Sequence, residues 1–451
     1  MRISASIPIA AFLSVAILTA CGGNSVLSSS TPTSAARSQA GLGPRAAHGV
    51  TEEVLYSFAG GSDAEHPTNV TLFASGGTLY SDSEQGGGSG CQSGDGCGTV
   101  FKVSTSGVES VLYSFEGKPD GQYAKGGLVE RSGVFYGTTQ VGGTNGYGTF
   151  FKITTSGKET VLHSFGAAVT GGYDGIYPYG GIIYVPADDK FYGTTIAGGT
   201  GSCGSGGGCG TVFSVTPSGK ETVLHSFAGG KDGDYLTGSL IYSNGQLYGT
   251  SQIGGGGGGS ACTNTTGPEG CGTIFSVSTS GKEKVLYSFT GASDGAFPDG
   301  GFVDVNGTLY GMAGSGGSGT GCNGGGCGTI FSLSASGAFK AIYSFKGAPK
   351  DGASPFGNLT DVNGVLYGTT ELGGASSKCK TSSGLAGCGV IFRVTTSGKE
   401  QTLYSFKDGK DGAIPTETLL YLNGVLYGTT HNGGSGSCSN GCGTVFSVSG
   451  F

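Results

Sequence analysis

The sequence predicts an all-β protein, a seven-bladed β-propeller with four-stranded blades. Three observations predict it: a short motif recurs seven times, each copy is accompanied by three further strand-like segments, and no segment shows helical periodicity. Glycine accounts for 97 of the 451 residues, which would suggest disorder if the glycines did not follow the repeat. With 36% hydrophobic and 12% charged residues, the chain can build a core.

The N-terminal segment resembles a bacterial lipoprotein signal. Arg2 precedes an apolar run over residues 7–18, and the run leads into Thr19-Ala20-Cys21. The resemblance implies that residues 1–20 are a signal peptide and that Cys21 becomes the lipid-carrying N-terminus. The alternative is an ordinary secretory signal followed by a chance cysteine, and both readings predict export. Residues 21–50 are rich in Ser, Thr, Ala and Gly and predict a flexible tether.

The first repeated motif is Leu-Tyr-Gly-Thr-Thr or a close variant. Its tyrosines are Tyr80, Tyr136, Tyr192, Tyr248, Tyr310, Tyr367 and Tyr427. Their successive spacings are 56, 56, 56, 62, 57 and 60 residues. Seven copies at this spacing predict seven structural units.

Two further motifs accompany each copy. Gly-Thr-Val-Phe or a variant ends in Phe101, Phe151, Phe213, Phe275, Phe331, Phe392 and Phe446. Leu-Tyr-Ser-Phe or a variant ends in Phe58, Phe115, Phe165, Phe227, Phe289, Phe345 and Phe406. A fourth apolar stretch, such as residues 127–129 or 419–421, completes each unit. Turn signals such as Asn306-Gly307 separate these segments, so each one predicts a strand.

The two ends of the repeat region complement each other. The region starts with a third-motif strand at residues 54–58 and stops with a second-motif strand at residues 443–451. In the internal repeats a hairpin joins these two kinds of strand. Pairing of the termini would therefore complete the last blade and remove an open sheet edge. We expect residues 51–451 to form one propeller whose ring is closed by the N-terminal strand.

Over residues 51–451 the repeat also resembles the tandem GloVer repeat of anchored bacterial proteins. The motifs that carry the resemblance include residues 135–139, Phe-Tyr-Gly-Thr-Thr, and residues 98–101, Gly-Thr-Val-Phe. The order of elements is similar to that of NHL-type propellers. The resemblance implies that the Gly-Leu-Val stretch is the innermost strand and Leu-Tyr-Ser-Phe the outermost, and it implies no established activity.

Twelve cysteines besides Cys21 fall into local pairs. The pairs are Cys91 and Cys97, Cys203 and Cys209, Cys262 and Cys271, Cys322 and Cys327, Cys379 and Cys388, and Cys438 and Cys442. One repeat, around residues 142–148, lacks both members of its pair. Loss of both together predicts six disulfides. Zinc is the alternative, but two cysteines without an adjacent histidine supply only half of a tetrahedral site.

The innermost-strand assignment places the disulfide loops and the blade-crossing loops on one face. Each crossing loop carries one acid: Asp63, Asp120, Asp174, Asp232, Asp294, Asp351 or Asp411. These acids either make turns or form a ring of carboxylates that binds cations or hydroxyl-rich ligands. His163 and His225 occupy the position of Tyr113 and are interpreted as packing variants.

Residues that depart from the repeat define a candidate site. Glu65 and His66 lie near Asp63 in the first crossing loop, Asp82 and Glu84 stand where Gly-Thr-Thr is usual, and His431 lies in the last blade. Ring closure would bring these residues to one seam, where they could bind a divalent cation or perform acid/base chemistry. The alternative is the irregularity common in terminal repeats. No other cofactor is expected.

Composition narrows the function classes. A net charge of −7 disfavours nucleic acid as a partner, and no second apolar run is long enough to cross a bilayer. Residues 291–295 fit a nucleophile-elbow pattern, but a chain rich in Gly and Ser produces such matches by chance.

The leading hypothesis is a monomeric, non-catalytic propeller of the cell envelope, held by its lipid anchor, that binds glycans, small ligands or a surface protein. The alternatives are a secreted lyase or hydrolase that uses the seam residues, and a purely structural envelope protein.

Overall fold

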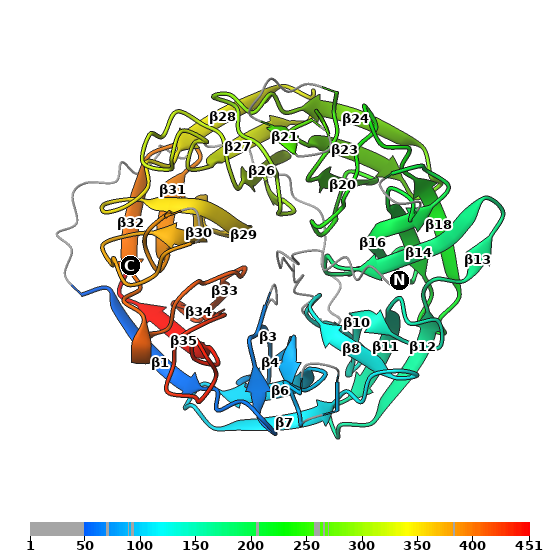
Figure 1. Cartoon of the computed structure of the whole chain (residues 1–451), viewed down its shortest axis with the longest axis horizontal. Coiled ribbons are helices and arrows are strands. Elements are labelled where there is room, and N and C mark those ends of the chain that lie inside the picture. Colours follow the sequence, from blue (N-terminus) through cyan, green and yellow to red (C-terminus); the bar gives the residue numbers. More distant parts are fainter. Residues whose placement is uncertain are drawn as a thin grey trace, which may run out of the picture.

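The computed structural model describes residues 49–451, apart from 69–71, 89, 92–93, 204–206, 257–261, 265–266, 269 and 382–383. Seven antiparallel sheets surround a central axis as the blades of a propeller (Figure 1). The predicted fold class is confirmed. The predicted signal peptide, Cys21 and nearly all of the tether lie outside the described residues. Within the described part of the chain, no helix is long and apolar enough to span a membrane.

Each blade runs from an inner strand near the axis to an outer strand on the circumference (Figure 1). The first blade comprises β3 (Phe73–Ser75), β4 (Thr78–Ser83), β6 (Thr99–Ser104) and β7 (Glu109–Ser114). The second comprises β8 (Gly121–Ala124), β9 (Val129–Arg131), β10 (Val134–Gly142), β11 (Thr149–Thr154) and β12 (Glu159–Ser164). The third comprises β13 (Ala168–Val169), β14 (Gly172–Pro178), β15 (Ile183–Val185), β16 (Lys190–Gly199), β17 (Thr211–Val215) and β18 (Glu221–Ser226).

The remaining blades repeat this plan. The fourth comprises β19 (Ile241–Ser243), β20 (Gln246–Ser251), β23 (Thr273–Ser278) and β24 (Glu283–Ser288). The fifth comprises β25 (Val303–Val305), β26 (Thr308–Ala313), β27 (Thr329–Ser334) and β28 (Phe339–Ser344). The sixth comprises β29 (Gly352–Val362), β30 (Val365–Gly373), β31 (Val390–Thr395) and β32 (Glu400–Ser405). The seventh comprises β33 (Leu420–Leu422), β34 (Val425–Thr430), β35 (Thr444–Ser449) and β1 (Thr51–Ser57).

The short elements outside the blades lie in loops. They are β2 (Ala64–Glu65), which pairs with β5 (Gln85–Gly86), the hairpin of β21 (Thr263–Asn264) and β22 (Gly267–Pro268), and the 3-10 turn η2 (Gly409–Asp411).

The last blade is closed by both ends of the repeat region. Strand β1 pairs antiparallel with β35, so that Val54 lies opposite Phe446 and Thr51 opposite Ser449. This strand occupies the outermost place that Leu-Tyr-Ser-Phe strands hold in the other blades (Figure 1). Ring closure by the N-terminal strand and the predicted strand order are both confirmed.

One aromatic contact recurs at every junction between blades. The phenylalanine after an outermost strand meets the phenylalanine of the next blade's third strand edge-on, with ring centroids 4.9–5.3 Å apart. The pairs are Phe58–Phe101, Phe115–Phe151, Phe165–Phe213, Phe227–Phe275, Phe289–Phe331, Phe345–Phe392 and Phe406–Phe446. These rings are almost fully buried. Edge-on packing of aromatic rings explains why two of the repeated motifs end in Phe.

The phenylalanine of the third strand also explains the glycine of Leu-Tyr-Gly-Thr-Thr, because its ring packs against that position. A Cβ atom on Gly137 would lie 2.7 Å from Cζ of Phe151, its cross-strand partner. The ring therefore crosses the strand where only glycine leaves room.

The six predicted disulfides are present, with Cα atoms 5.0–5.3 Å apart. In the second blade, Tyr147 takes the place of the second cysteine. Its carbonyl accepts the N–H of Tyr177, as the carbonyl of Cys97 accepts the N–H of Tyr123, and its ring lies against Gly166. Six disulfides indicate an oxidising, extracytoplasmic environment.

Candidate functional site

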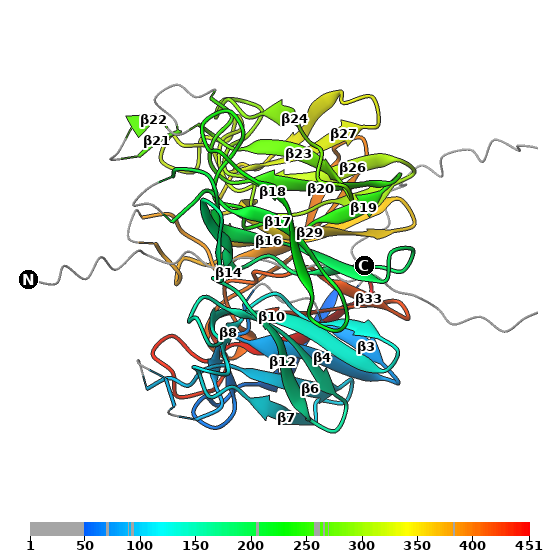
Figure 2. The ribbon, with the colours of Figure 1, turned by 90° about the vertical axis from the view of Figure 1, so that its right-hand side faces the viewer.

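The disulfide loops and the crossing loops lie together at one end of the ring. Figure 2 shows β21 and β22 at this end, and inner strands such as β3, β19 and β33 toward the other end. Gly87 and Gly88 of the first disulfide loop donate hydrogen bonds to the carbonyls of Asp63 and Gly61 in the preceding crossing loop, at 2.9 and 2.7 Å. This end is therefore the loop-rich face of the propeller.

Two positions of the repeat meet on this face. The loop position lies five residues after the crossing-loop acid and holds Thr68, Lys125, Tyr179, Thr237, Asp299, Phe356 and Thr416. The strand position follows the Gly-Thr-Thr segment and holds Glu84, Gln140, Ile196, Gln252, Gly314, Glu371 and His431. The loop position of one blade contacts the strand position of the blade before it, as in Thr68–His431, Lys125–Glu84 and Asp299–Gln252.

An aromatic cluster shows that the loop position reaches the axis. Tyr179 and Ile196 of the third blade and Phe356 of the sixth blade share one hydrophobic cluster. Because those two blades are not neighbours, their side chains must meet across the centre of the ring.

The crossing-loop acids lie farther out and are paired there. Asp63 accepts the hydroxyl hydrogen of Tyr56 at 2.9 Å and the N–H of Ala59 at 2.8 Å. The other pairs are Tyr113–Asp120, His163–Asp174, His225–Asp232, Tyr287–Asp294, Tyr343–Asp351 and Tyr404–Asp411. Each acid thus ties an outermost strand to the following crossing loop, and Asp63 is directed away from the seam histidines.

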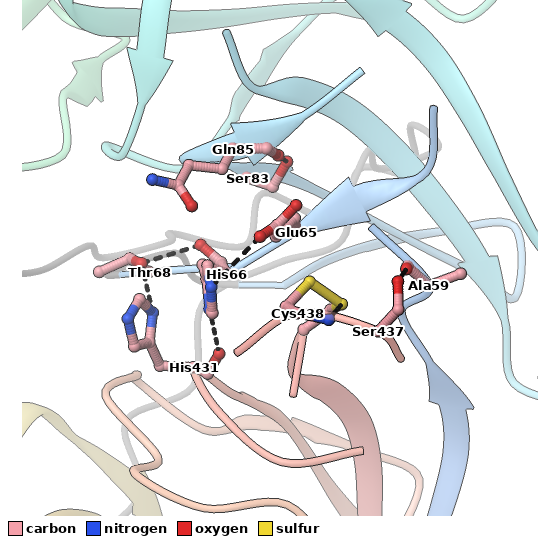
Figure 3. A network of polar contacts seen from close by, with 10 residues as sticks. Ala59, Glu65, His66, Thr68, Ser83, Gln85, His431, Ser437 and Cys438 are labelled. Atoms are coloured by element: carbon pink, nitrogen blue, oxygen red, sulfur yellow. Dashed lines mark hydrogen bonds and ion pairs between the residues drawn. A yellow bond between two sulfur atoms is a disulfide. The ribbon is translucent and has the colours of Figure 1, made fainter. Parts of the chain in front are cut away.

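His66 and His431 meet where the ring closes (Figure 3). Their ring centroids are 4.5 Å apart, and Nδ1 of His66 donates to the backbone carbonyl of His431 at 2.8 Å. Thr68 donates its hydroxyl hydrogen to the carbonyl of His66 and lies 3.0 Å from Nδ1 of His431. Because that hydrogen is already used, Nδ1 of His431 must be the donor in the second contact.

The protonation state of His431 follows from its burial. Burial lowers the pKa of His431 to about 3, and the neighbouring His66 adds to the effect. His431 is therefore neutral near pH 7, with its lone pair on Nε2. The Nε2 atom of His66 lies 3.4 Å from Glu65. Cys438 is also close to this pair, but its sulfur belongs to a disulfide and is no metal ligand.

A buried ion pair adjoins the histidines. Nζ of Lys125 lies 2.8 Å from Glu84, and the lysine side chain is only 1% exposed. Burial would raise the pKa of Glu84, but Lys125 more than offsets it, so that the pKa is lowered. Together, Glu65, His66, Thr68, Glu84, Lys125 and His431 form the seam cluster.

Two carboxyl groups lie buried beside the seam cluster. Asp82 stands where other blades have a threonine, such as Thr194, whose hydroxyl donates to the carbonyl of Gly238 in the next blade. Burial raises the pKa of Asp82 to about 8 and that of Glu417 well above its usual range, with Asp82 raising Glu417 further. Neither carboxyl accepts a hydrogen bond of good geometry from the described residues. A protonated Asp82 can donate a hydrogen bond as the threonines do.

A cavity of about 320 Å³ opens on the opposite side of the axis. Its lining includes Gln252, Phe297, Asp299, Pro355, Phe356 and Glu371. Asp299 accepts hydrogen bonds from the side chains of Gln252 at 2.5 Å and Thr237 at 3.2 Å. Burial raises the pKa of Asp299 to about 7 and that of Glu371 to about 8, and the charge of Asp299 contributes to the latter.

The cavity residues Asp299 and Glu371 were not predicted from the sequence. Asp299 and Glu371 depart from the repeat as clearly as Asp82 and Glu84 do, but they lie in internal blades. A comparison of the loop and strand positions across all seven repeats would have found them. The structure places Glu65, His66, Glu84 and His431, four of the residues expected at the seam, in one region. Lys125, which also lies there, was not predicted from the sequence.

Comparison with known proteins gives a family and distant folds. The family described as Gloeobacter/Verrucomicrobia repeat matches residues 42–263 and 260–446. No curated protein matches the chain.

Three solved structures illustrate the distant similarity. A prolyl endopeptidase is 12% identical, with a TM-score of 0.41 over 84% of this chain and 47% of its own, so this chain spans about half its length. A gluconolactonase from Xanthomonas campestris is 16% identical, with a TM-score of 0.39 over 70% and 86%. A putative 6-phosphogluconolactonase from Bacteroides uniformis is 12% identical, with a TM-score of 0.47 over 78% and 89%. These neighbours are enzymes by name.

Proposed function

We propose that this chain, which belongs to the Gloeobacter/Verrucomicrobia repeat family, is a binding module for a neutral, hydroxyl-rich ligand such as a glycan segment. The family repeat implies no activity by itself, so the proposal rests on the geometry of the site. The observation that carries this proposal is the cavity of about 320 Å³, in which carboxyl and amide groups face aromatic rings. That volume lies at the lower end of the range for small-molecule sites.

The lining chemistry favours a neutral ligand. Gln252, Asp299 and Glu371 offer hydrogen-bond donors and acceptors, because the raised pKa values keep Glu371 largely protonated and Asp299 partly protonated near pH 7. Phe297 and Phe356 supply apolar faces against which a sugar ring can pack. An anion would meet no cationic side chain among these lining residues.

Calorimetric titration and thermal unfolding with a panel of soluble oligosaccharides test the proposal. A ligand that binds the native state raises the unfolding midpoint. We expect Asp299→Asn and Phe297→Ala to weaken binding at least about 10-fold, the loss of one or two buried contacts. Gln140→Ala, at the same strand position outside the cavity, should bind as the unchanged protein does. Absence of binding to every glycan, or binding insensitive to both cavity variants, would refute the proposal.

A secreted lyase or hydrolase at the seam is the second candidate. The neutral Nε2 of His431 beside His66 is the observation that favours it, since this atom can accept a proton. His66→Ala with His431→Ala should abolish such an activity and leave glycan binding at the cavity intact. Retention of turnover in the double variant would exclude the seam as a catalytic centre.

We further propose that the propeller acts at the cell envelope as a monomer held by lipid on Cys21, where it meets glycans or surface proteins. Cys21→Ser should release the protein from the membrane fraction, and its retention there would contradict the anchor.

A further inference from the structure

The outer rim of the propeller repeats one three-residue arrangement at its blade junctions. An aromatic residue of an outermost strand, the crossing-loop acid and a residue of the next outermost strand meet there. The carboxyl-lined junctions are Tyr56–Asp63–Glu109, Tyr113–Asp120–Glu159, Tyr343–Asp351–Glu400 and Tyr404–Asp411–Glu52. In one junction Phe339 replaces the glutamate and stacks on Tyr287 at 3.8 Å.

Two adjacent junctions replace the tyrosine with histidine. His163 meets Asp174 and Glu221, and His225 meets Asp232 and Glu283. In each group the histidine nitrogen and two carboxylate oxygens lie within 4.8 Å of one another. A phenol hydroxyl can only donate to the acid, whereas a neutral imidazole nitrogen is a strong ligand for a metal ion.

We propose that these two junctions are divalent-cation sites of the zinc class, each formed by one histidine and two carboxylates. Zinc sites with three protein ligands keep their fourth place for water. The histidine side chains are 18% and 22% exposed, so both junctions lie close to the surface of the rim.

The distances between histidine and aspartate suit such an ion. Nε2 of His163 lies 3.0 Å from Oδ2 of Asp174, and Nε2 of His225 lies 3.5 Å from Oδ2 of Asp232. Ligands about 2.0–2.1 Å from a tetrahedral ion lie about 3.3 Å from one another. The Asp174 carboxylate is held in place by the N–H groups of Gly166 and Ala167.

Unsatisfied buried atoms lie at both junctions. Nε2 of His225, Oε1 of Glu221 and Oε1 of Glu283 are buried without a hydrogen-bond partner of good geometry. A buried polar atom without a partner costs about 1–3 kcal/mol. A cation at the first junction would satisfy Glu221, and one at the second would satisfy His225 and Glu283 together.

The repeat supplies matched variants for the test. The full chain is stripped with EDTA, dialysed against Zn²⁺ and analysed for metal per chain. We expect two ions, one after His163→Tyr, one after His225→Tyr and none after both changes. Tyrosine is the residue that five junctions already carry, so these variants should fold, which circular dichroism checks.

Two gain-of-site variants sharpen the test. Tyr113→His places an imidazole beside Asp120 and Glu159 and should add a third ion. Tyr287→His should add none, because Phe339 stands where the glutamate would be. Co²⁺ gives an independent readout, since a tetrahedral absorption band should appear and disappear with the double His→Tyr variant.

Zinc that is absent from the unchanged protein, or that stays bound after both histidines are replaced, would overturn the proposal. Equal gains from Tyr113→His and Tyr287→His would do the same, because the glutamate would then contribute nothing.

Discussion

The seam cluster and the cavity are built from the same two repeat positions, but the pKa values of their buried carboxyl groups shift in opposite directions. At the seam, the cation Lys125 lies 2.8 Å from Glu84 and lowers its pKa. In the cavity, the hydrogen-bond partners of Asp299 among the described residues are the neutral side chains of Gln252 and Thr237, and its pKa is raised to about 7. A buried carboxyl group therefore stays ionised where a cation faces it and holds its proton where none does.

This difference suits two different tasks. The seam cluster joins the first, second and last blades through charged and hydrogen-bonded contacts, at the place where the N-terminal strand closes the ring. The cavity offers neutral donors and acceptors beside aromatic rings, as a neutral ligand requires.

The largest effect is expected from Lys125→Met. Without the cation, the buried Glu84 must either keep its charge without a partner or take up a proton, which should cost about 3–5 kcal/mol in the free energy of unfolding. Urea unfolding followed by circular dichroism measures the change. The double variant Lys125→Met, Glu84→Gln should recover most of the loss. Equal instability of the single and double variants would show that lost packing, not charge, is responsible.

The cavity should make stability depend on pH. Asp299 and Glu371 have pKa values raised to about 7 and 8 in the folded state, above their usual values near 4. The folded chain then binds more protons than the unfolded chain, so their contribution is full below about pH 4 and is lost as pH rises toward 8.

Asp299→Asn isolates this contribution. Relative to the unchanged protein, the variant should lose less stability between pH 5 and 8, by up to about 1.4 kcal/mol per pH unit. Urea unfolding at several pH values measures the difference. Asp189→Asn is the control, because Asp189 is exposed and ion-paired with Arg131 and should not flatten the profile. Parallel profiles for Asp299→Asn and the unchanged protein would contradict the assignment.

The smallest effect is expected from replacing a threonine in each region, Thr68 in the seam cluster and Thr237 beside the cavity. Thr68→Val removes the hydroxyl that accepts from His431 and donates to the carbonyl of His66, and should cost about 1–3 kcal/mol. Thr237→Val should cost less, about 0.5–1.5 kcal/mol, because Gln252 still donates to Asp299. Thermal unfolding of both variants provides the comparison. A larger loss from Thr237→Val would reverse the proposed ranking of the two networks.

Much of this arrangement follows from the sequence repeat. Ring closure between residues 54–58 and 443–451 and the six disulfides could be predicted because each depends on segments adjacent in a repeat or on one missing partner at the chain ends. The strand order was implied by the resemblance to known propeller repeats. The seam histidines were found because they interrupt the pattern. Lys125 was missed, since one lysine in a loop gives no sign that it will be 1% exposed.

By itself, the sequence determined the number of blades, the strands of each blade and the cysteines that form disulfides in the loops. These features arise from short-range pairing, which a local pattern encodes. Only the tertiary structure decided which side chains meet between blades and across the axis. Tyr179 and Phe356 share a cluster although they lie three blades apart, and Asp299 raises the pKa of Glu371 from the neighbouring blade. Such contacts depend on how the blades pack around the axis, because that packing sets the distance between inner strands and the burial that shifts each charge.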